Sequence, residues 1–220
     1  MRKLLGLLIA CGLCTSAFAQ GVNLELGYTY IYAPQWDKAL QTYNFARPFV
    51  SEKQALLQHG VFADWHAVFA SQHTLKQGLG LSYSYFRSTA ENPGLINTLN
   101  LHLARPYYLM HFQKEAGKGL YSELTVAVLL GGMTRRVNEE SYLIDGDRAM
   151  ALGIGGELAY KAGYCIKLGA SSAIAPFVQV GVAPFYYSPK TEQLLNQTME
   201  LTSNATSPIF QGRAGLALAW

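Results

Sequence analysis

The sequence predicts an all-β fold, an eight-stranded antiparallel transmembrane up-and-down β-barrel, for three reasons. The chain opens with a secretory leader, and apolar and polar residues then alternate over eight strand-sized segments. Beyond the leader, no stretch approaches the ~20 consecutive apolar residues of a membrane-spanning helix. Because a bilayer offers the backbone no hydrogen-bond partners, a spanning chain without such a helix must close into a barrel. We expect one barrel domain over residues 20–220.

Residues 1–19 are predicted to be a signal peptide that is cleaved on secretion. An apolar stretch over 4–13 follows two basic residues, and Ala17-Phe-Ala19 supplies a small-x-small cleavage site. The mature protein then begins at Gln20. A lipobox-like segment ending at Cys11 is the competing site. It is disfavoured because the apolar segment before it is short and because it ignores the better site at Ala19.

The predicted strands follow one another with turn residues between them. They cover 22–32, 59–69, 78–87, 98–112, 119–130, 149–165, 173–187 and 208–220. Most reach the ~9 to 11 residues that a tilted strand needs to cross a bilayer. The connections after strands two, four and six are short. Those after strands one, three, five and seven are mostly longer, at 33–58, 88–97, 131–148 and 188–207, as in barrels with periplasmic turns and outer loops.

Alternation assigns each strand an outer and an inner face. On the first strand the outer face carries Val22, Leu24, Leu26, Tyr28, Tyr30 and Tyr32. On the second it carries Val61, Ala63, Trp65, Ala67 and Phe69, and on the fifth Leu120, Leu124, Val126, Val128 and Leu130. On the sixth it carries Leu152, Ile154, Leu158 and Tyr160, and on the eighth Phe210, Leu216, Leu218 and Trp220. We expect these faces to contact lipid.

Aromatic residues sort by the expected height along the strands. At the loop ends lie Tyr30, Tyr32, Tyr83, Tyr85, Tyr186 and Tyr187, and at the turn ends lie Phe69, Phe112, Tyr121, Tyr164 and Trp220. Two aromatic bands are typical of a membrane barrel because amphipathic rings prefer the headgroup level. A soluble secreted β-sandwich would explain the alternation but not this sorting.

The inner face is predicted to hold a polar network of Glu25, Asp64, His66, Glu123, Glu157, Lys161 and Arg213, together with Asn100, His102 and Gln179. An eight-stranded barrel is just wide enough for its own side chains, so a packed network is favoured over a channel lining. Burial without pairing would be too costly. Room for long side chains is expected at Gly27, Gly80, Gly153, Gly155, Gly163, Gly181 and Gly215.

Catalytic motifs are weak in this sequence. Asp64 and His66 share a face and are the candidate general base and its orienter, with Ser82 or Ser84 as nucleophile if the next strand aligns them. The histidines have no metal-ligand spacing, and Cys165 is the only cysteine after the leader, so we expect neither a metal nor a cofactor. The 17 basic residues fall to 15 without the leader, against 14 acidic ones, so nucleic acid is not an expected partner.

The last strand, from Phe210 to Trp220, ends on an aromatic residue and resembles the C-terminal signature of bacterial outer-membrane barrels. As a whole the chain resembles small eight-stranded barrels of the OmpA/OmpX type and, more loosely, PorT-like barrel-domain proteins. That resemblance implies a bacterial outer-membrane location and recognition of the last strand by the barrel-assembly machinery. It does not select one activity, because the group includes anchors, adhesins and a few enzymes. The His-x-Ser-Asn motif of lipid A deacylases is absent.

The leading functional hypothesis is a non-enzymatic barrel with a filled lumen, whose surface loops make structural or adhesive contacts. A lipid-modifying enzyme acting on lipid A acyl chains and a narrow channel are the alternatives. Arg135 and Arg136 are candidate contacts to lipopolysaccharide phosphates, since guanidinium matches phosphate oxygens. The first long loop, 33–58, is rich in aromatic residues. We prefer a loop folded onto the barrel mouth over an exposed adhesive surface; no partner protein is predicted.

Overall fold

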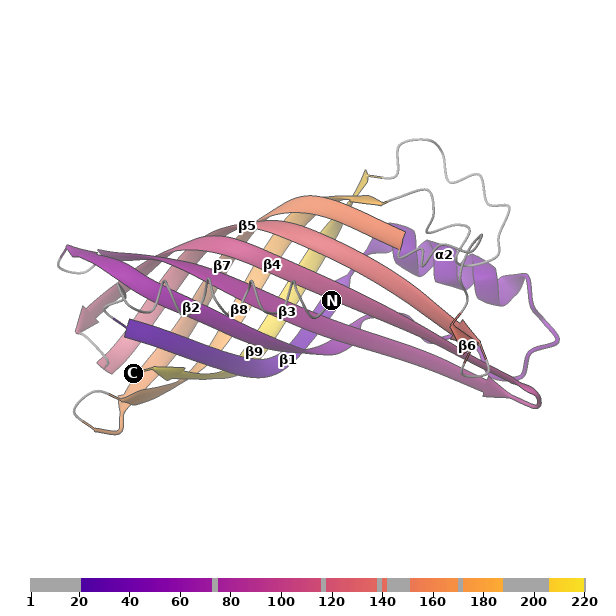
Figure 1. The fold of residues 1–220 in the computed structure, drawn as a ribbon, viewed down its shortest axis with the longest axis horizontal. Helices are drawn as coiled ribbons and strands as arrows, with labels where there is room; N and C mark the ends of the chain where they lie inside the picture. Colours follow the sequence, from indigo (N-terminus) through magenta and orange to yellow (C-terminus); the bar gives the residue numbers. More distant parts are fainter. Residues whose placement is uncertain are drawn as a thin grey trace.

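The computed structural model describes residues 21–72, 75–115, 118–137, 140–141, 151–169, 172–187 and 206–219. Within them, eight long antiparallel strands form the wall of a barrel (Figure 1). They are β1 (Gly21–Tyr32), β2 (His59–Gln72), β3 (Leu75–Asn92), β4 (Leu95–Glu115), β5 (Lys118–Val137), β7 (Ala151–Lys167), β8 (Ala173–Tyr187) and β9 (Thr206–Ala219). The expected leader and the terminal Trp220 lie outside the described residues.

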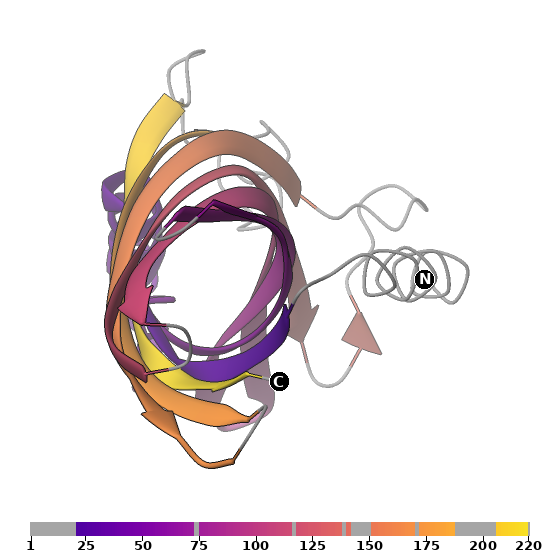
Figure 2. The ribbon, with the colours of Figure 1, turned by 90° about the vertical axis from the view of Figure 1, so that its left-hand side faces the viewer.

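The barrel is closed, because every long strand pairs with two neighbours. β1 pairs with β2 on one side and with β9 on the other, and β4 pairs with β5, which joins the two ends of the sheet order. The view along the barrel in Figure 2 shows the strands following one another around a ring. A short strand, β6 (Glu140–Ser141), pairs only with the end of β5. The predicted eight-stranded antiparallel barrel is confirmed.

All eight long strands expose large apolar side chains on the outer face of the wall. Leu120, Val180 and Leu26 are 77%, 65% and 54% exposed, whereas Glu25, the neighbour of Leu26 in sequence, is 1% exposed. Soluble proteins rarely expose contiguous apolar surface of this extent. The alternation of apolar outside and polar inside is that of a membrane barrel. The predicted outer faces of strands one, five and eight agree with this burial pattern over their described residues.

Three strands are much longer than predicted. β3, β4 and β5 have 18, 21 and 20 residues, well beyond the length needed to cross a bilayer. The expected loop 88–97 is mostly strand, because the β3–β4 ladder continues to the Asn92–Leu95 pair and turns over two residues. One of them, Gly94, has φ +73°, which suits glycine. This extension is polar and pairs its own backbone, so hydrophobic alternation does not reveal it.

The loop after β1 contains a helix, α2 (Pro34–Phe45), that closes one end of the barrel (Figure 1). Proline at its start suits the first turn, where no backbone donor is needed. Trp36, Leu40 and Tyr43 are buried in one core cluster with inward-facing residues of the strands, among them Leu101 and Phe185. The preferred interpretation, a loop folded onto the mouth, is thus confirmed for α2, whereas Phe45 and Phe49 of the same loop are exposed. Within the described residues, no helix is both long and apolar enough to cross a membrane.

Candidate functional site: a buried charge network

The site is built from two rows of inward-facing side chains, each supplied by four strands that are neighbours in the barrel. In the first row each residue pairs in register with the next: Glu123, Lys161, Gln179 and Arg213, on β5, β7, β8 and β9. The second row, likewise in register, is Glu25, Asp64, Ser82 and Arg105, on β1 to β4. All eight are at most 4% exposed. Because the barrel is closed, the two rows meet across its interior.

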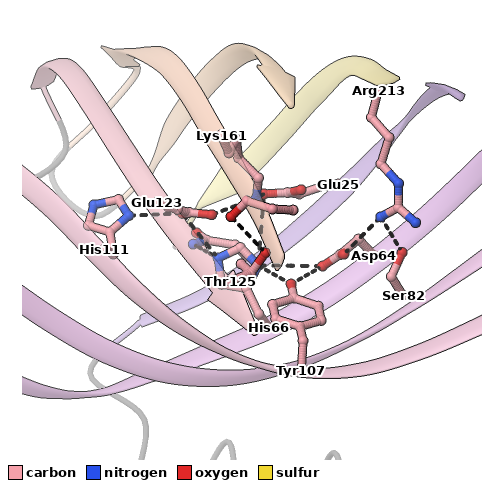
Figure 3. A network of polar contacts seen from close by, with 12 residues as sticks. Glu25, Asp64, His66, Ser82, Tyr107, His111, Glu123, Thr125, Lys161 and Arg213 are labelled. Carbon is pink, nitrogen blue, oxygen red and sulfur yellow. Dashed lines mark hydrogen bonds and ion pairs between the residues drawn. The ribbon is translucent and has the colours of Figure 1, made fainter. Parts of the chain in front are cut away.

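Lys161 links the two rows (Figure 3). Its Nζ lies 2.7 Å from Glu25 Oε1 and 2.6 Å from Glu123 Oε2. The three side chains are 1–2% exposed, so each charge depends on the others for the stabilisation that water would otherwise give. The ammonium is also 5.0 Å from the centre of the Phe177 ring, a distance that permits a cation–π interaction. Lys161 thus bridges two carboxylates, one from each row, and compensates part of their charge.

His66 lies below this cation and contacts several acidic groups. Its Nδ1 is 3.5 Å from Asp64 Oδ1 and 3.1 Å from the Tyr107 hydroxyl, and its Nε2 is 2.6 Å from Asn23 Nδ2. Tyr107 in turn donates its hydroxyl hydrogen to Asp64 Oδ1 at 2.5 Å. Figure 3 shows Asp64 and His66, on β2, and Tyr107, on β4, pointing toward one another. The contacts fix the orientation of both rings inside the barrel.

Two arginines complete the network. Arg213 donates to the hydroxyls of Ser82 at 2.8 Å and Ser84 at 3.1 Å, and its Nη1 is 3.9 Å from Asp64 Oδ2. Arg105 pairs with Glu157 at 3.1 Å. Among the described residues of the network, four carboxylates therefore face three permanent cations, with His66 and His111 as further donors. His111 contacts Glu123 at 2.9 Å.

Three of the glycines predicted to make room do so inside this network. A β-carbon on Gly80 would collide with the Tyr107 ring, and one on Gly163 would lie 2.5 Å from the ring of Tyr121. One on Gly181 would lie 2.5 Å from Glu157 Oε1. Each large side chain therefore occupies space above a glycine on a neighbouring strand. Large side chains therefore fit closely over glycines at the centre of the barrel.

The structure brings together all seven predicted network residues, but two further residues that were expected in the lumen lie elsewhere. Asn100 and His102 were expected inside, yet they lie on the outer face of β4, where they meet the hydroxyls of Tyr85 and Tyr83 at 2.6 Å and 2.5 Å. That part of the prediction is wrong. The inward positions of this stretch are Leu99, Leu101 and Leu103, which pack in the core cluster with α2. The usual polarity of the two faces is reversed there.

Sequence reasoning missed three inward residues of β4, namely Arg105, Tyr107 and His111. A signal for them was present in residues 104–113. There the even positions Tyr108, Met110 and Phe112 are apolar and the odd ones are mostly polar. The reversed polarity at the other half of the strand concealed this alternation.

The geometry does not assemble a nucleophile with a base. Ser82 and Ser84 both accept hydrogen bonds from Arg213, and, among the described residues, the groups that contact the ring nitrogens of His66 include Asn23 and Tyr107 but no serine. Asp64 and His66 are 2% and 0% exposed, so a substrate has no contact with them. Donor atoms of Glu25, His66 and Glu123 do lie within 4.8 Å of one another, an arrangement that suits a metal ion. The ammonium of Lys161 already bridges the two carboxylates of that group.

At the loop end, Arg135 holds the helix that closes the barrel. It donates to Asn97 Oδ1 at 2.8 Å and to the Tyr43 hydroxyl at 3.3 Å, whereas Arg136 is exposed. Asp37, on the first turn of α2, is buried and accepts a hydrogen bond of 2.8 Å from Gln58 Nε2. Burial raises the pKa of Asp37, and the hydrogen bond from Gln58 offsets part of that rise.

Two matching tyrosine–histidine pairs lie on the outer wall toward the loop end of the barrel, where α2 lies. The Tyr28 hydroxyl contacts His59 Nδ1, and the Tyr83 hydroxyl contacts His102 Nδ1. In each pair the histidine is directly opposite a second tyrosine, Tyr30 or Tyr85. Their rings are amphipathic and half exposed, as expected at a headgroup level.

Comparison with known proteins finds distant structural matches and no family. No protein-family model matches the chain, and its sequence matches no curated protein. Solved structures that resemble it include Neisserial surface protein A (NspA), at 8% identity and a TM-score of 0.46, covering 90% of this chain and 94% of that one. Ail, the attachment invasion locus protein of Yersinia pestis, is 8% identical with a TM-score of 0.39, and the match covers 91% of this chain and 98% of that one. The outer-membrane protease OmpT of Escherichia coli is 9% identical with a TM-score of 0.40, and the match covers 91% of this chain and 95% of that one. The chain is a closed eight-stranded barrel, similar in fold to small outer-membrane barrels.

Proposed function

We propose that this chain is a non-enzymatic barrel protein of the bacterial outer membrane that is closed to solutes and acts through its loop end. The observation that carries the proposal is the double closure of the interior. Glu25, Glu123 and Lys161 fill the centre with paired charges, and α2 packs over the mouth with Trp36 and Leu40 buried. Such an interior favours a rigid support for surface contacts over a channel or an enzyme.

The apolar outer wall supports the membrane location. Tyrosines at one end and rings such as Phe112 and Tyr164 at the other flank the aliphatic zone. Cleavage of the leader before Gln20 and recognition of Trp220 by the assembly machinery remain predictions from the sequence. Protein extracted from membranes is expected to migrate differently in a detergent gel before and after boiling. Identical migration of the two samples would argue against a closed barrel in the membrane.

Two features favour contacts at the loop end. Phe45 and Phe49, which flank the end of α2, are 87% and 81% exposed, far more than is usual for phenylalanine. They offer an apolar surface, and Arg136, at the end of β5, is exposed as well. We assign lipopolysaccharide phosphate to Arg136 rather than Arg135, because Arg135 is engaged with Asn97 and Tyr43.

Conductance tests the closed interior. Purified protein in planar bilayers is expected to give no steady single-channel steps, and such steps would support the channel alternative. A variant in which residues 34–45 are replaced by a Gly/Ser linker is also expected to stay closed, because the charge network remains. Mass spectra of lipid A from cells with and without the protein are expected to be identical. A loss or gain of an acyl chain would make the enzyme alternative the better one.

The contact surface is tested on cells that display the protein. Replacing Phe45 and Phe49 with serine is expected to reduce attachment of the cells to hydrocarbon droplets without changing heat-modifiable migration. Equal attachment of cells that display the variant and the unmodified protein would show that this loop does not make the proposed contacts. Arg136→Gln is expected to reduce the lipopolysaccharide phosphate that copurifies with the protein. Arg135→Gln serves as the comparison, and a smaller loss in Arg136→Gln than in Arg135→Gln would refute our assignment.

A further inference from the structure

A groove lies on the outer wall near the turn that joins β4 to β5, on the opposite end from α2. It has a volume of about 470 Å³. Its apolar walls include Phe112, Leu120 and Tyr160, which are 42%, 77% and 51% exposed. This is the face that the proposed function places in contact with lipid.

Small residues produce the groove. Ser122 and Ala162 face outward side by side, since they pair in register between β5 and β7. On β5 the next outward residues are Leu120 and Leu124, and on β7 they are Tyr160 and Tyr164. Larger side chains therefore surround a depression two strands wide. Phe112, the register partner of Ser122 on β4, lies along one side.

Positive charge borders one end of this groove. Lys114 lines it directly, and Lys118 follows on the same hairpin. Both side chains are exposed, and Glu115 is the register partner of Lys118 after a shift of the β4–β5 register that follows Gln113. At this position, between the apolar wall and the turn, the two ammonium groups lie at the height of the headgroups of the leaflet that the short turns face.

We propose that the groove and Lys114 form a binding site for an anionic phospholipid of that leaflet. One acyl chain lies over Ser122 and Ala162, and the phosphate contacts Lys114, with Lys118 adding to the attraction. Apolar contact alone does not distinguish one phospholipid from another, since their chains are alike. Headgroup charge therefore supplies the preference, at roughly a five-fold factor for each lysine near the surface. The site rests on the proposed membrane location.

Native mass spectrometry of the full chain, released from detergent micelles, tests the proposal. The probes are phosphatidylglycerol and phosphatidylcholine with the same acyl chains. The unmodified protein is expected to retain phosphatidylglycerol in preference to phosphatidylcholine. Lys114→Gln/Lys118→Gln is expected to lose that preference, and Ser122→Leu, which fills the groove, to lose both bound lipids. Lys38→Gln removes an exposed charge at the other end of the barrel, on α2, and is expected to leave binding unchanged.

Several outcomes overturn the proposal. The preference for phosphatidylglycerol could survive in the double lysine variant, or Ser122→Leu could bind as much lipid as the unmodified protein. A dimer mass that disappears in Ser122→Leu would instead make the groove an interface between two copies. Insertion into phosphatidylcholine vesicles, read by heat-modifiable migration, is measured for every variant. A protein that fails to insert contradicts the proposed function, whereas one that inserts without a lipid preference contradicts only this site.

Discussion

Replacing Lys161 with methionine tests whether the charge network stabilises the barrel. Methionine keeps much of the length of the side chain but leaves Glu25 and Glu123 without the ammonium that lies 2.7 Å and 2.6 Å from their oxygens. At an effective dielectric constant of ~20, each pair attracts by about 6 kcal/mol. The desolvation of three buried charges, several kcal/mol each, cancels most of that sum. The intact network therefore contributes little net free energy, but a broken one is costly.

The expected loss in the free energy of unfolding is about 3–5 kcal/mol, the usual effect of leaving a buried charge without its partner. It is measured by urea titration of the barrel in lipid vesicles, with tryptophan fluorescence and heat-modifiable migration as two readouts. Lys38→Met on the exposed side of α2 is the matched control and is expected to change stability by less than ~0.5 kcal/mol. The triple change Lys161→Met, Glu25→Gln, Glu123→Gln is expected to restore much of the loss, because no unpaired charge remains. A loss below ~1 kcal/mol in Lys161→Met would refute this reasoning.

Three further changes test other parts of the structure. Gly80→Ala places a β-carbon against the Tyr107 ring and is expected to cost ~1–3 kcal/mol in the same titration, whereas Gly156→Ala meets open space and serves as its control; equal effects would count against the close fit. Arg135→Gln removes charged hydrogen bonds to Asn97 and Tyr43, which together stabilise the docked α2 by about 1.5–3 kcal/mol. Proteolysis of α2 is therefore expected to increase. Unchanged cleavage would show that Arg135 does not hold the helix. Since the pKa of Asp37 is raised in the folded protein, its contribution is fully present below the unfolded value of 3.8 and is lost as pH rises through the raised pKa. Hydrogen exchange of α2 is thus expected to quicken over that window in the unmodified protein and not in Asp37→Asn, and the same pH profile in both would exclude Asp37 as the cause.

The sequence predicted those parts of the fold where one face is lipid-like and the other is charged. On β1, for example, Glu25 stands between Leu24 and Leu26, and the structure buries Glu25 and exposes Leu26. The prediction from the sequence was wrong where the strands extend beyond the apolar zone of the wall. There the outward positions of β4 become polar, as at Asn100 and His102, and the inward Leu101 packs under a helix from a distant loop. That inversion depends on α2, whose position no local pattern indicates.

The network shows the same limit at finer scale. Membership of Glu25, Asp64 and Lys161 followed from alternation alone, but their partners depend on strand register and on contacts across the barrel. Lys161 and Glu25 are 136 residues apart in sequence, and they lie on β7 and β1, which are not neighbours in the sheet. Only closure of the barrel brings them together. The sequence therefore identifies which charges are buried, whereas the closed ring determines how they are neutralised, and for that reason changes at Lys161 test the closure more directly than changes in the wall.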